Sequence, residues 1–426
     1  MTAAAIPRFV GTPQESAVKR PLFMSGGRNA GICRGAMMIL AMTVVIQAAF
    51  AATGVLVADD GPVTGPVTGP VSGPVTGPVS RQGLTEQTQP DPQTIPADAQ
   101  TIREAVSRAI PLLERGSAGS ASERQCFTCH NQAVPVLALV AARDAGFCVD
   151  AQNLVRQMSH TAAHLERGRD DYKQGKGQGG QVLMAGYALW TLDAAGYPPD
   201  ELTTSVAGYV IGYQRDKGHW EHRGSRPPSS GSDFSATYVA LRALQRFAPA
   251  DQSEQAAARR KAVQDWLRQE RPLETEDHVF RLRALSALAL DPASAVDMQA
   301  LRQGAVSDLL ALQREDGGWA QKGDMLSDAY ATGTVLAALR QDGGIASGDA
   351  VVERAIPYLL RTQCADGSWH VTTRAVPFQT YYESGFPHGP DQFLSIAATG
   401  WCVIALVEAL PDRPGERDGE GAVKTR

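Results

Sequence analysis

A seven-residue pattern, Gln-x3-Gly-x-Trp, recurs in the second half of the chain. Its copies begin at Gln214, Gln313 and Gln363, so they stand 99 and 50 residues apart. A second repeated segment, Arg-Ala-Ile-Pro, begins at Arg108 and again at Arg354. Halving the wider gap gives a period of about 50 residues, the length of one unit in a repeat protein. The chain is therefore expected to fold as a series of like units that pack on their neighbours.

A second series has the same period and indicates that each unit holds two helices. Its members are apolar, alanine-rich segments with helical spacing, at 133–147, 183–197, 236–247, 279–290, 330–339 and 396–410. Alanine-rich helices suit close packing in an inner ring, and the first helices, richer in Arg and Glu, suit an outer ring. We predict an all-α fold: an α/α toroid of six inner and six outer helices over residues 100–411.

The residues of the Gln-x3-Gly-x-Trp turn are expected to have a structural role. Glycine permits the left-handed conformation that ends a helix, and glutamine can satisfy open backbone groups there. Tryptophan covers the turn with a large apolar face. We therefore expect these turns to build the fold and not to carry chemistry.

The three turns resemble the Gln-Trp motifs of the squalene cyclases, a family whose fold is also similar to that of the protein prenyltransferases. The cyclase pattern places an aromatic residue five before the glutamine, as Tyr209 and Tyr358 do here, whereas the middle copy has Asp308. The resemblance covers about 310 residues. It implies the same toroid.

The active sites of those families are not intact in this chain. The resemblance would imply an Asp-x-Asp-Asp acid motif for a cyclase, and none occurs. For a prenyltransferase it would imply zinc ligands, of which the aspartate survives as Asp328 while cysteine and histidine do not. An enzyme acting on an apolar isoprenoid substrate stays open as an alternative, with Asp233, Asp277 or Asp328 as the acid and Tyr330 or Tyr382 lining the cavity.

One repeat position, eleven residues before an apolar position of the inner helices, is polar in every unit. Its occupants are Asn131, Gln181, Asp233, Asp277, Asp328 and Ser395. Because the inner helices should run in one direction, their N-termini should gather at one mouth of the ring. The six residues are expected to cap those helices, and a polar binding mouth is the other interpretation. The mouth residues that we expect are Asn131, Gln181, Tyr330, Tyr382 and Asp391.

Cys126-Phe127-Thr128-Cys129-His130 is the motif that carries chemistry. Two thiols at Cys-x-x-Cys spacing can bond to the two vinyl groups of haem, and the adjacent His130 is then placed under the iron. A zinc site, a Cys126–Cys129 disulfide and an inert pair remain open. Because the motif lies in the first unit, with no room for a separate cytochrome domain, a covalent haem would sit on the ring near its mouth.

Four residues are candidates for the sixth ligand of the iron. His160 and His164 lie four residues apart, hence on one helix face, and Met158 is close to them. His388 belongs to a long aromatic segment, 377–392, that leads into the last inner helix and should pass over the same mouth as His130. This segment is expected to be either a functional lid or a seal between the last and first units.

The N-terminal sequence indicates export. Basic residues precede an apolar run at 36–50 that ends in small residues, as in a secretory signal. We expect residues 1–58 to be a signal peptide, or else an uncleaved membrane anchor. Residues 59–99 repeat Gly-Pro-Val-Thr/Ser and should form a disordered linker, and 412–426 a disordered tail. The chain should therefore lie in the periplasm, or be tethered to the outer side of a membrane.

The charge of the chain limits the classes of partner that we expect. The net charge is −5 and no block of Lys or Arg interrupts the chain, so a nucleic-acid partner is excluded. We predict a c-type haem protein for electron transfer or redox sensing, with a periplasmic redox partner. The alternatives are the isoprenoid enzyme, with an apolar small molecule as partner, and a ligand-binding scaffold without catalysis. A Cys364–Cys402 disulfide is the most plausible pairing of the remaining cysteines.

Overall fold

The computed structural model describes residues 97–213, 217–224, 226–290, 295–376 and 380–411. These residues form helices and connecting loops, with no strand among them. The expected signal segment, nearly all of the linker and the expected tail lie outside the described residues. Their assignment stays a prediction.

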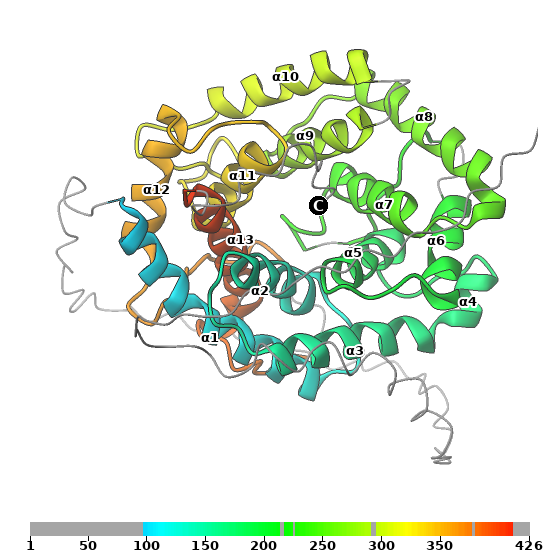
Figure 1. The fold of residues 1–426 in the computed structure, drawn as a ribbon, viewed down its shortest axis with the longest axis horizontal. Helices are drawn as coiled ribbons and strands as arrows, with labels where there is room; N and C mark the ends of the chain where they lie inside the picture. Colours follow the sequence, from blue (N-terminus) through cyan, green and yellow to red (C-terminus); the bar gives the residue numbers. More distant parts are fainter. Residues whose placement is uncertain (1–96, 214–216, 225, 291–294, 377–379, 412–426) are drawn as a thin grey trace, which may run out of the picture. The chain divides into compact units, whose positions relative to one another are not determined.

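Six helices form a closed inner ring (Figure 1). They are α2 (Val134–Asp144), α5 (Gln181–Ala194), α7 (Asp233–Phe247), α9 (Thr275–Ala289), α11 (Ala329–Gln341) and α13 (Gln392–Ala409). Each contacts the next in this order, and α13 also contacts α2. The last contact closes the ring, because it joins the final unit to the first.

An outer helix precedes each inner helix along the chain. The outer helices are α1 (Ala99–Glu123), α3 (Ala151–Arg167), α6 (Glu201–Tyr213), α8 (Ser253–Gln269), α10 (Ala295–Ala311) and α12 (Ala350–Thr362), with the short α4 (Arg169–Lys173) after α3. Figure 1 shows them around the outside of the inner ring. The predicted toroid of six helix pairs is confirmed.

The three Gln-x3-Gly-x-Trp turns have the predicted structural role. Trp220, Trp319 and Trp369 are buried, and each indole Nε1 donates to a carbonyl of the preceding outer helix at 2.8 Å. Each tryptophan's backbone N–H donates to a threonine Oγ1 of the next inner helix, at 3.0–3.2 Å. The glycines of the turns have φ between +74° and +97°, in the left-handed region. Each turn therefore joins the two helices of its unit.

Aromatic side chains cross the interior of the ring. Trp190 of α5 lies 6.3 Å from Trp401 of α13 and 5.3 Å from Tyr238 of α7, measured between ring centroids. The guanidinium of Arg283, from α9, lies 5.3 Å from the Trp401 centroid. Because α13 is not the ring neighbour of α5 or α9, the two contacts of Trp401 span the ring. Side chains therefore fill the interior of the ring around Trp401.

Helix α13 is apolar along its whole length. The segment Gly389–Ala409 is long and apolar enough to cross a membrane, with a mean hydropathy of 1.5. However, 78% of the apolar window is buried inside the protein. An inner helix surrounded by α1, α2 and α11 accounts for this composition.

The favoured disulfide is not formed. Cys364 and Cys402 are both free thiols. Cys402 is buried on α13, and its Sγ donates to the carbonyl of Ala329, 3.3 Å away, on α11. The expectation of a Cys364–Cys402 bond is wrong, because membership of one unit does not bring the two side chains together.

Candidate cofactor-binding site

The last two residues of the Cys-x-x-Cys-His motif, Cys129 and His130, begin a single π-helical turn. This turn, Cys129–Ala133, leads directly into α2 and is capped by Thr128, whose Oγ1 accepts from the Asn131 N–H at 3.2 Å. Gln132 Oε1 accepts in return from the Thr128 N–H at 2.9 Å and from its hydroxyl at 2.8 Å. Single π-helical turns are frequent at functional sites. Here the turn fixes the position of His130.

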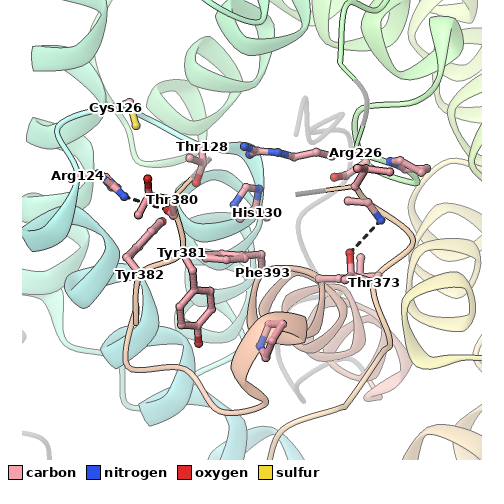
Figure 2. Close-up of a pocket in the computed structure, with 16 residues that line it drawn as sticks. Arg124, Cys126, Thr128, His130, Arg226, Thr373, Thr380, Tyr381, Tyr382 and Phe393 are labelled. Atoms are coloured by element: carbon pink, nitrogen blue, oxygen red, sulfur yellow. Dashed lines mark hydrogen bonds between the residues drawn. The ribbon is translucent and has the colours of Figure 1, made fainter. Parts of the chain in front are cut away.

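A cavity of about 320 Å³ opens beside the motif (Figure 2). Its size lies within the roughly 300–1,000 Å³ that is typical of small-molecule sites. The motif, the loop before α7 and the segments before and at the start of α13 supply its walls, including Cys126, His130, Arg226, Tyr382 and Phe393. All three regions adjoin the N-terminal ends of inner helices. The cavity therefore lies at the predicted mouth.

The two cysteines of the motif differ in exposure. Cys126 is exposed on the cavity wall, whereas Cys129 is buried. The Cys129 Sγ lies 3.8 Å from His130 Nδ1 and 3.9 Å from Ser229 Oγ, and burial raises its pKa. Both thiols are free, so the structure contains no Cys126–Cys129 disulfide.

His130 presents a neutral imidazole to the cavity. Burial, with a smaller contribution from the charge of Arg226, lowers its pKa to about 3. Its ring packs edge-on against Phe393, with 5.5 Å between the centroids. A neutral, immobilised imidazole has a lone pair available for a metal at physiological pH.

The cavity wall carries positive charge. Arg124 and Arg226 line it, and no Asp or Glu does so among the described residues. Arg124 donates to the Thr380 carbonyl at 3.1 Å, and its guanidinium lies 4.9 Å from the Tyr382 ring centroid. Figure 2 shows the Arg226 side chain extending toward Thr128 and His130. The site can therefore attract an anionic group to the side of His130.

The four candidates for a sixth ligand lie outside the cavity wall. His160 and His164 on α3 pack behind the motif: His160 Nε2 lies 3.3 Å from the Cys126 carbonyl, and His164 stacks on Phe127 at 6.1 Å. Met158 is partly buried against the core. His388 stacks on His370, with its Nε2 2.7 Å from Ser368 Oγ.

Among the expected mouth residues, Tyr382 lines the cavity. Asp391 supports it from outside, because its Oδ1 accepts from the N–H of Thr373, a wall residue, at 2.9 Å. Asn131 is fully buried, and neither polar atom of its side chain has a hydrogen-bond partner among the described residues. Gln181 Oε1 accepts from the Tyr209 hydroxyl at 3.3 Å, and Tyr330 donates to Glu276 Oε1 at 3.2 Å.

The polar repeat position is a helix cap in one unit. Asp328 is the N-cap of α11 and accepts from the Ala331 N–H at 3.0 Å. In the other units the expectation of an N-cap is wrong, because the helix starts shift relative to the repeat: the N-cap residues of α2, α5, α7, α9 and α13 are Ala133, Gly180, Ser232, Glu274 and Asp391. Ser395 lies inside α13 and accepts from the Val371 N–H.

The three candidate acids have different surroundings. Asp233 Oδ1 lies 2.6 Å from His222 Nδ1, and its Oδ2 lies 3.3 Å from His219 Nε2. Asp277 Oδ2 accepts backbone N–H groups at 3.0–3.1 Å in a capping box. Burial raises the pKa of Asp328, whose Oδ2 has no hydrogen-bond partner among the described residues. None of the three lines the cavity.

Sequence reasoning missed Glu276 and Arg226. Glu276 is buried in α9, and burial raises its pKa to about 8. No sequence signal marks it, because glutamate at a helix start usually faces solvent. Arg226 belongs to the 19-residue connection between α6 and α7. That length exceeds the 2–8 residues common between packed helices. Loop length, which drew attention to segment 377–392, would have drawn attention to this loop as well.

A zinc site receives no support from the geometry. Tetrahedral zinc needs three or four Cys, His, Asp or Glu ligands. Over the described parts of the chain, no group of three or more such side chains is arranged to hold a metal.

No protein-family model matches the chain, and no curated protein matches it significantly. Among solved structures, it is similar to the type II terpene cyclase MstE from Scytonema. A variant of that cyclase in complex with geranylgeranyl dihydroxybenzoate is 16% identical, with a TM-score of 0.48, over 73% of this chain and 98% of the cyclase. The apo cyclase is 17% identical, with a TM-score of 0.45, over 73% and 99%. A protein from Actinoplanes is 15% identical, with a TM-score of 0.46, over 73% and 100%. Likeness at this level says nothing about activity.

Proposed function

We propose that this chain is an exported c-type haem protein, in which the α/α toroid holds the haem at its mouth for redox or ligand-binding chemistry. The observation that carries the proposal is that Cys126 and His130 line one cavity, with Cys129 directly beside it. Export, indicated by the N-terminal sequence, agrees with haem attachment outside the cytoplasm.

The motif supplies the side chains that a covalent haem needs. The Cys126 and Cys129 thiols would each add across one vinyl group: sulfur bonds to one carbon, the thiol hydrogen goes to the other, and no atom is lost. His130 would be the axial ligand, since burial keeps its imidazole neutral. When bound, haem would supply a redox-active, ligand-binding iron.

The remaining wall residues could contact the carboxylates and the flat macrocycle of a haem. Arg124 and Arg226 would pair with its carboxylates, because a guanidinium forms strong charge-assisted bonds with carboxylate oxygens. Tyr382 and Phe393 supply flat apolar surfaces against which a macrocycle can pack. Their rings lie 5.2 Å apart between centroids, so they form one continuous aromatic wall.

A haem stain after denaturing electrophoresis tests the proposal. The full chain is expressed with a cytochrome c maturation system, and we expect a stained band. Replacing both motif thiols, Cys126→Ala with Cys129→Ala, should abolish the stain. Cys364→Ala is the matched control, because Cys364 is a free thiol in a Gln-Trp turn. An unstained wild-type band would overturn the proposal.

An enzyme acting on an apolar isoprenoid substrate is the second candidate. The observation in its favour is Glu276, a buried carboxylic acid that stays protonated at neutral pH because burial raises its pKa to about 8. Such a group can donate a proton to an alkene. Incubation with a geranylgeranyl-bearing aromatic acid, followed by mass spectrometry and NMR of the extract, tests it. Cyclised product that is lost in Glu276→Gln or Asp328→Asn would favour this candidate.

A further inference from the structure

A buried carboxylic acid lies inside the ring and has no part in the proposed haem attachment. Glu276, in the first turn of α9, is 4% exposed, although a glutamate at the start of a helix usually faces solvent. Its Oε1 accepts a hydrogen bond from the hydroxyl of Tyr330, on α11, at 3.2 Å. Tyr330 is buried as well. Burial of a carboxyl group in this way favours its neutral, protonated form.

Two buried tyrosines connect this carboxyl group with the Cys-x-x-Cys-His motif. Tyr330 and Tyr187, which belongs to α5, each interact electrostatically with both Glu276 and Cys129. Because α5 is not a ring neighbour of α9 or α11, these groups act on one another across the interior of the ring (Figure 1). All four side chains are buried, so solvent does little to screen them. A change of charge beside Cys129 should therefore be felt at Glu276.

Burial outweighs the charged groups around Glu276. It raises the pKa of Glu276 to about 8, and Asp277 of the same helix acts in the same direction. The hydrogen bond from Tyr330 acts in the opposite direction, as do the charges of Arg283 and Arg374. The carboxyl group therefore titrates near neutral pH, where one added charge nearby is enough to change its protonation.

The other helices packed against α9 direct their titratable groups elsewhere. Tyr238 of α7 acts on Tyr187. Asp308 of α10 acts on His278 and Arg281, on the side of α9 that α8 also contacts. The protonation of the buried carboxyl group is therefore governed by burial and by the groups inside the ring.

We infer that Glu276 takes up a proton when the haem iron is reduced, so that electron transfer to this protein is coupled to proton uptake. This inference rests on the proposed haem attachment, which places the iron at the cavity beside Cys129. Reduction adds one electron from an external donor to the iron, and the added negative charge favours the protonated form of a nearby carboxyl group. One proton from solvent then binds a Glu276 carboxylate oxygen, and reoxidation releases both.

Chemical denaturation of the purified full chain, with or without haem, tests the proton site by itself. A group whose folded-state pKa is raised contributes stability that is full below its unfolded pKa, about 4.3 for Glu, and is lost as pH rises through the folded value. Glu276→Gln stays neutral at every pH, so its denaturation midpoint should rise relative to the wild type between pH 5 and pH 9. Glu254→Gln is the control and should show no such rise, because Glu254 is likewise the second residue of its helix, α8, but is exposed.

Tyr330→Phe provides a second variant at the same site. It removes a donor to the ionised carboxyl group, so the pKa of Glu276 should rise further and the loss of stability should begin at a higher pH. Infrared spectroscopy at pH 7 detects the proton directly. We expect the band of a protonated carboxyl group in the wild type and its absence in Glu276→Gln.

Potentiometric titration of the stained holoprotein between pH 6 and pH 9 tests the coupling. The potential of the wild type should fall as pH rises, because an ionised Glu276 stabilises the oxidised iron. The potentials of the wild type and Glu276→Gln should agree at pH 6 and separate as pH rises, with the variant higher at pH 9. Groups that titrate in both proteins, the haem carboxylates included, cancel in this difference.

The measurements separate the inference from the proposed function. Stained protein whose potential depends on pH equally in the wild type and Glu276→Gln would overturn the coupling and leave the haem attachment standing. If the midpoints of Glu276→Gln and Glu254→Gln followed the same course with pH, the proton site itself would be refuted. Protein without haem would overturn the proposed function and the coupling with it, whatever the denaturation shows.

Discussion

Gln363 Nε2 donates to the carbonyl oxygen of Ala105 at 2.9 Å, across 258 positions of the chain. The same nitrogen donates to the Gly367 carbonyl at 2.9 Å, so one side chain holds both its own turn and the first helix of the ring. Gln313 makes the equivalent pair of bonds, to Gly317 and to Val351 of the next unit. The glutamine bond that joins two neighbouring units at Gln313 therefore also joins the last unit to the first at Gln363.

Gly367→Ala should destabilise the ring at this closure. Gly367 has φ +97°, and an added Cβ would lie 2.6 Å from the Arg108 carbonyl oxygen on α1. We expect a loss of about 2–4 kcal/mol in the free energy of unfolding, from backbone strain and overpacking together. Chemical denaturation measures it. Gly344→Ala is the control, because Gly344 has φ +76° but open space around it. Equal losses in both variants would show that the contact with α1 contributes nothing.

Asp342→Ala should be among the most damaging single changes. Arg283 is buried, and its Nη1 lies 2.8 Å from Asp342 Oδ2. Removing the carboxylate leaves a buried, uncompensated charge, which costs about 3–5 kcal/mol. The control is Asp144→Ala, whose ion pair with Arg143 is exposed and worth at most about 1 kcal/mol. Similar denaturation midpoints for the two variants would contradict this account of the ring interior.

Asp328→Ala should lower stability by about 1 kcal/mol, because α11 loses its N-cap acceptor. Asp328→Asn retains an acceptor oxygen and should unfold like the wild type. If Asp328 instead acts as an acid in isoprenoid chemistry, the Asn variant would keep its stability and lose turnover. Thermal unfolding and product analysis of the two variants together separate a cap from a catalytic acid.

The loop that carries Arg226 should be held more tightly at low pH. The hydrogen bond with Asp233 raises the pKa of His222. A histidine with a raised folded-state pKa contributes stability that is full below its unfolded pKa, about 6.5, and is lost as pH rises through the folded value. His222→Gln should therefore lower Tm by roughly 1–2 °C at pH 5.5 and by less at pH 8.5.

His278→Gln is the comparison for this pH effect. Burial lowers the pKa of His278, so its contribution to stability is present above the unfolded pKa and declines as pH falls. The glutamine variant should gain relative to the wild type at pH 5.5. Scanning calorimetry at several pH values measures both variants. If the Tm difference from the wild type changed with pH in the same direction for both variants, the opposite pKa shifts of His222 and His278 would be refuted.

The ring could be predicted from sequence because its signal is periodic. Turns such as that of Trp369 repeat a local bonding scheme, so spacing alone located the helix pairs. Helix starts could not be located as well: Asp233 occupies the same repeat position as Asp328 but follows a longer loop and contacts His222 and not a backbone N–H of its own helix.

The candidate site was only partly predictable. His130 and Tyr382 meet in one cavity because the units that close the ring bring positions 130 and 382 together, which the circular order of helices implies. His388 turns away to Ser368, and Arg226 enters from a loop without periodicity. Side-chain direction in long loops depends on local contacts that no repeat pattern encodes.

Intact mass spectrometry of the full chain under denaturing conditions tests the central claim most directly. The protein is produced with a cytochrome c maturation system and compared with the variant that lacks both Cys126 and Cys129. The account predicts that the wild type is heavier than its polypeptide by the mass of one haem and that the variant is not. A wild-type mass equal to that of the polypeptide alone would contradict it.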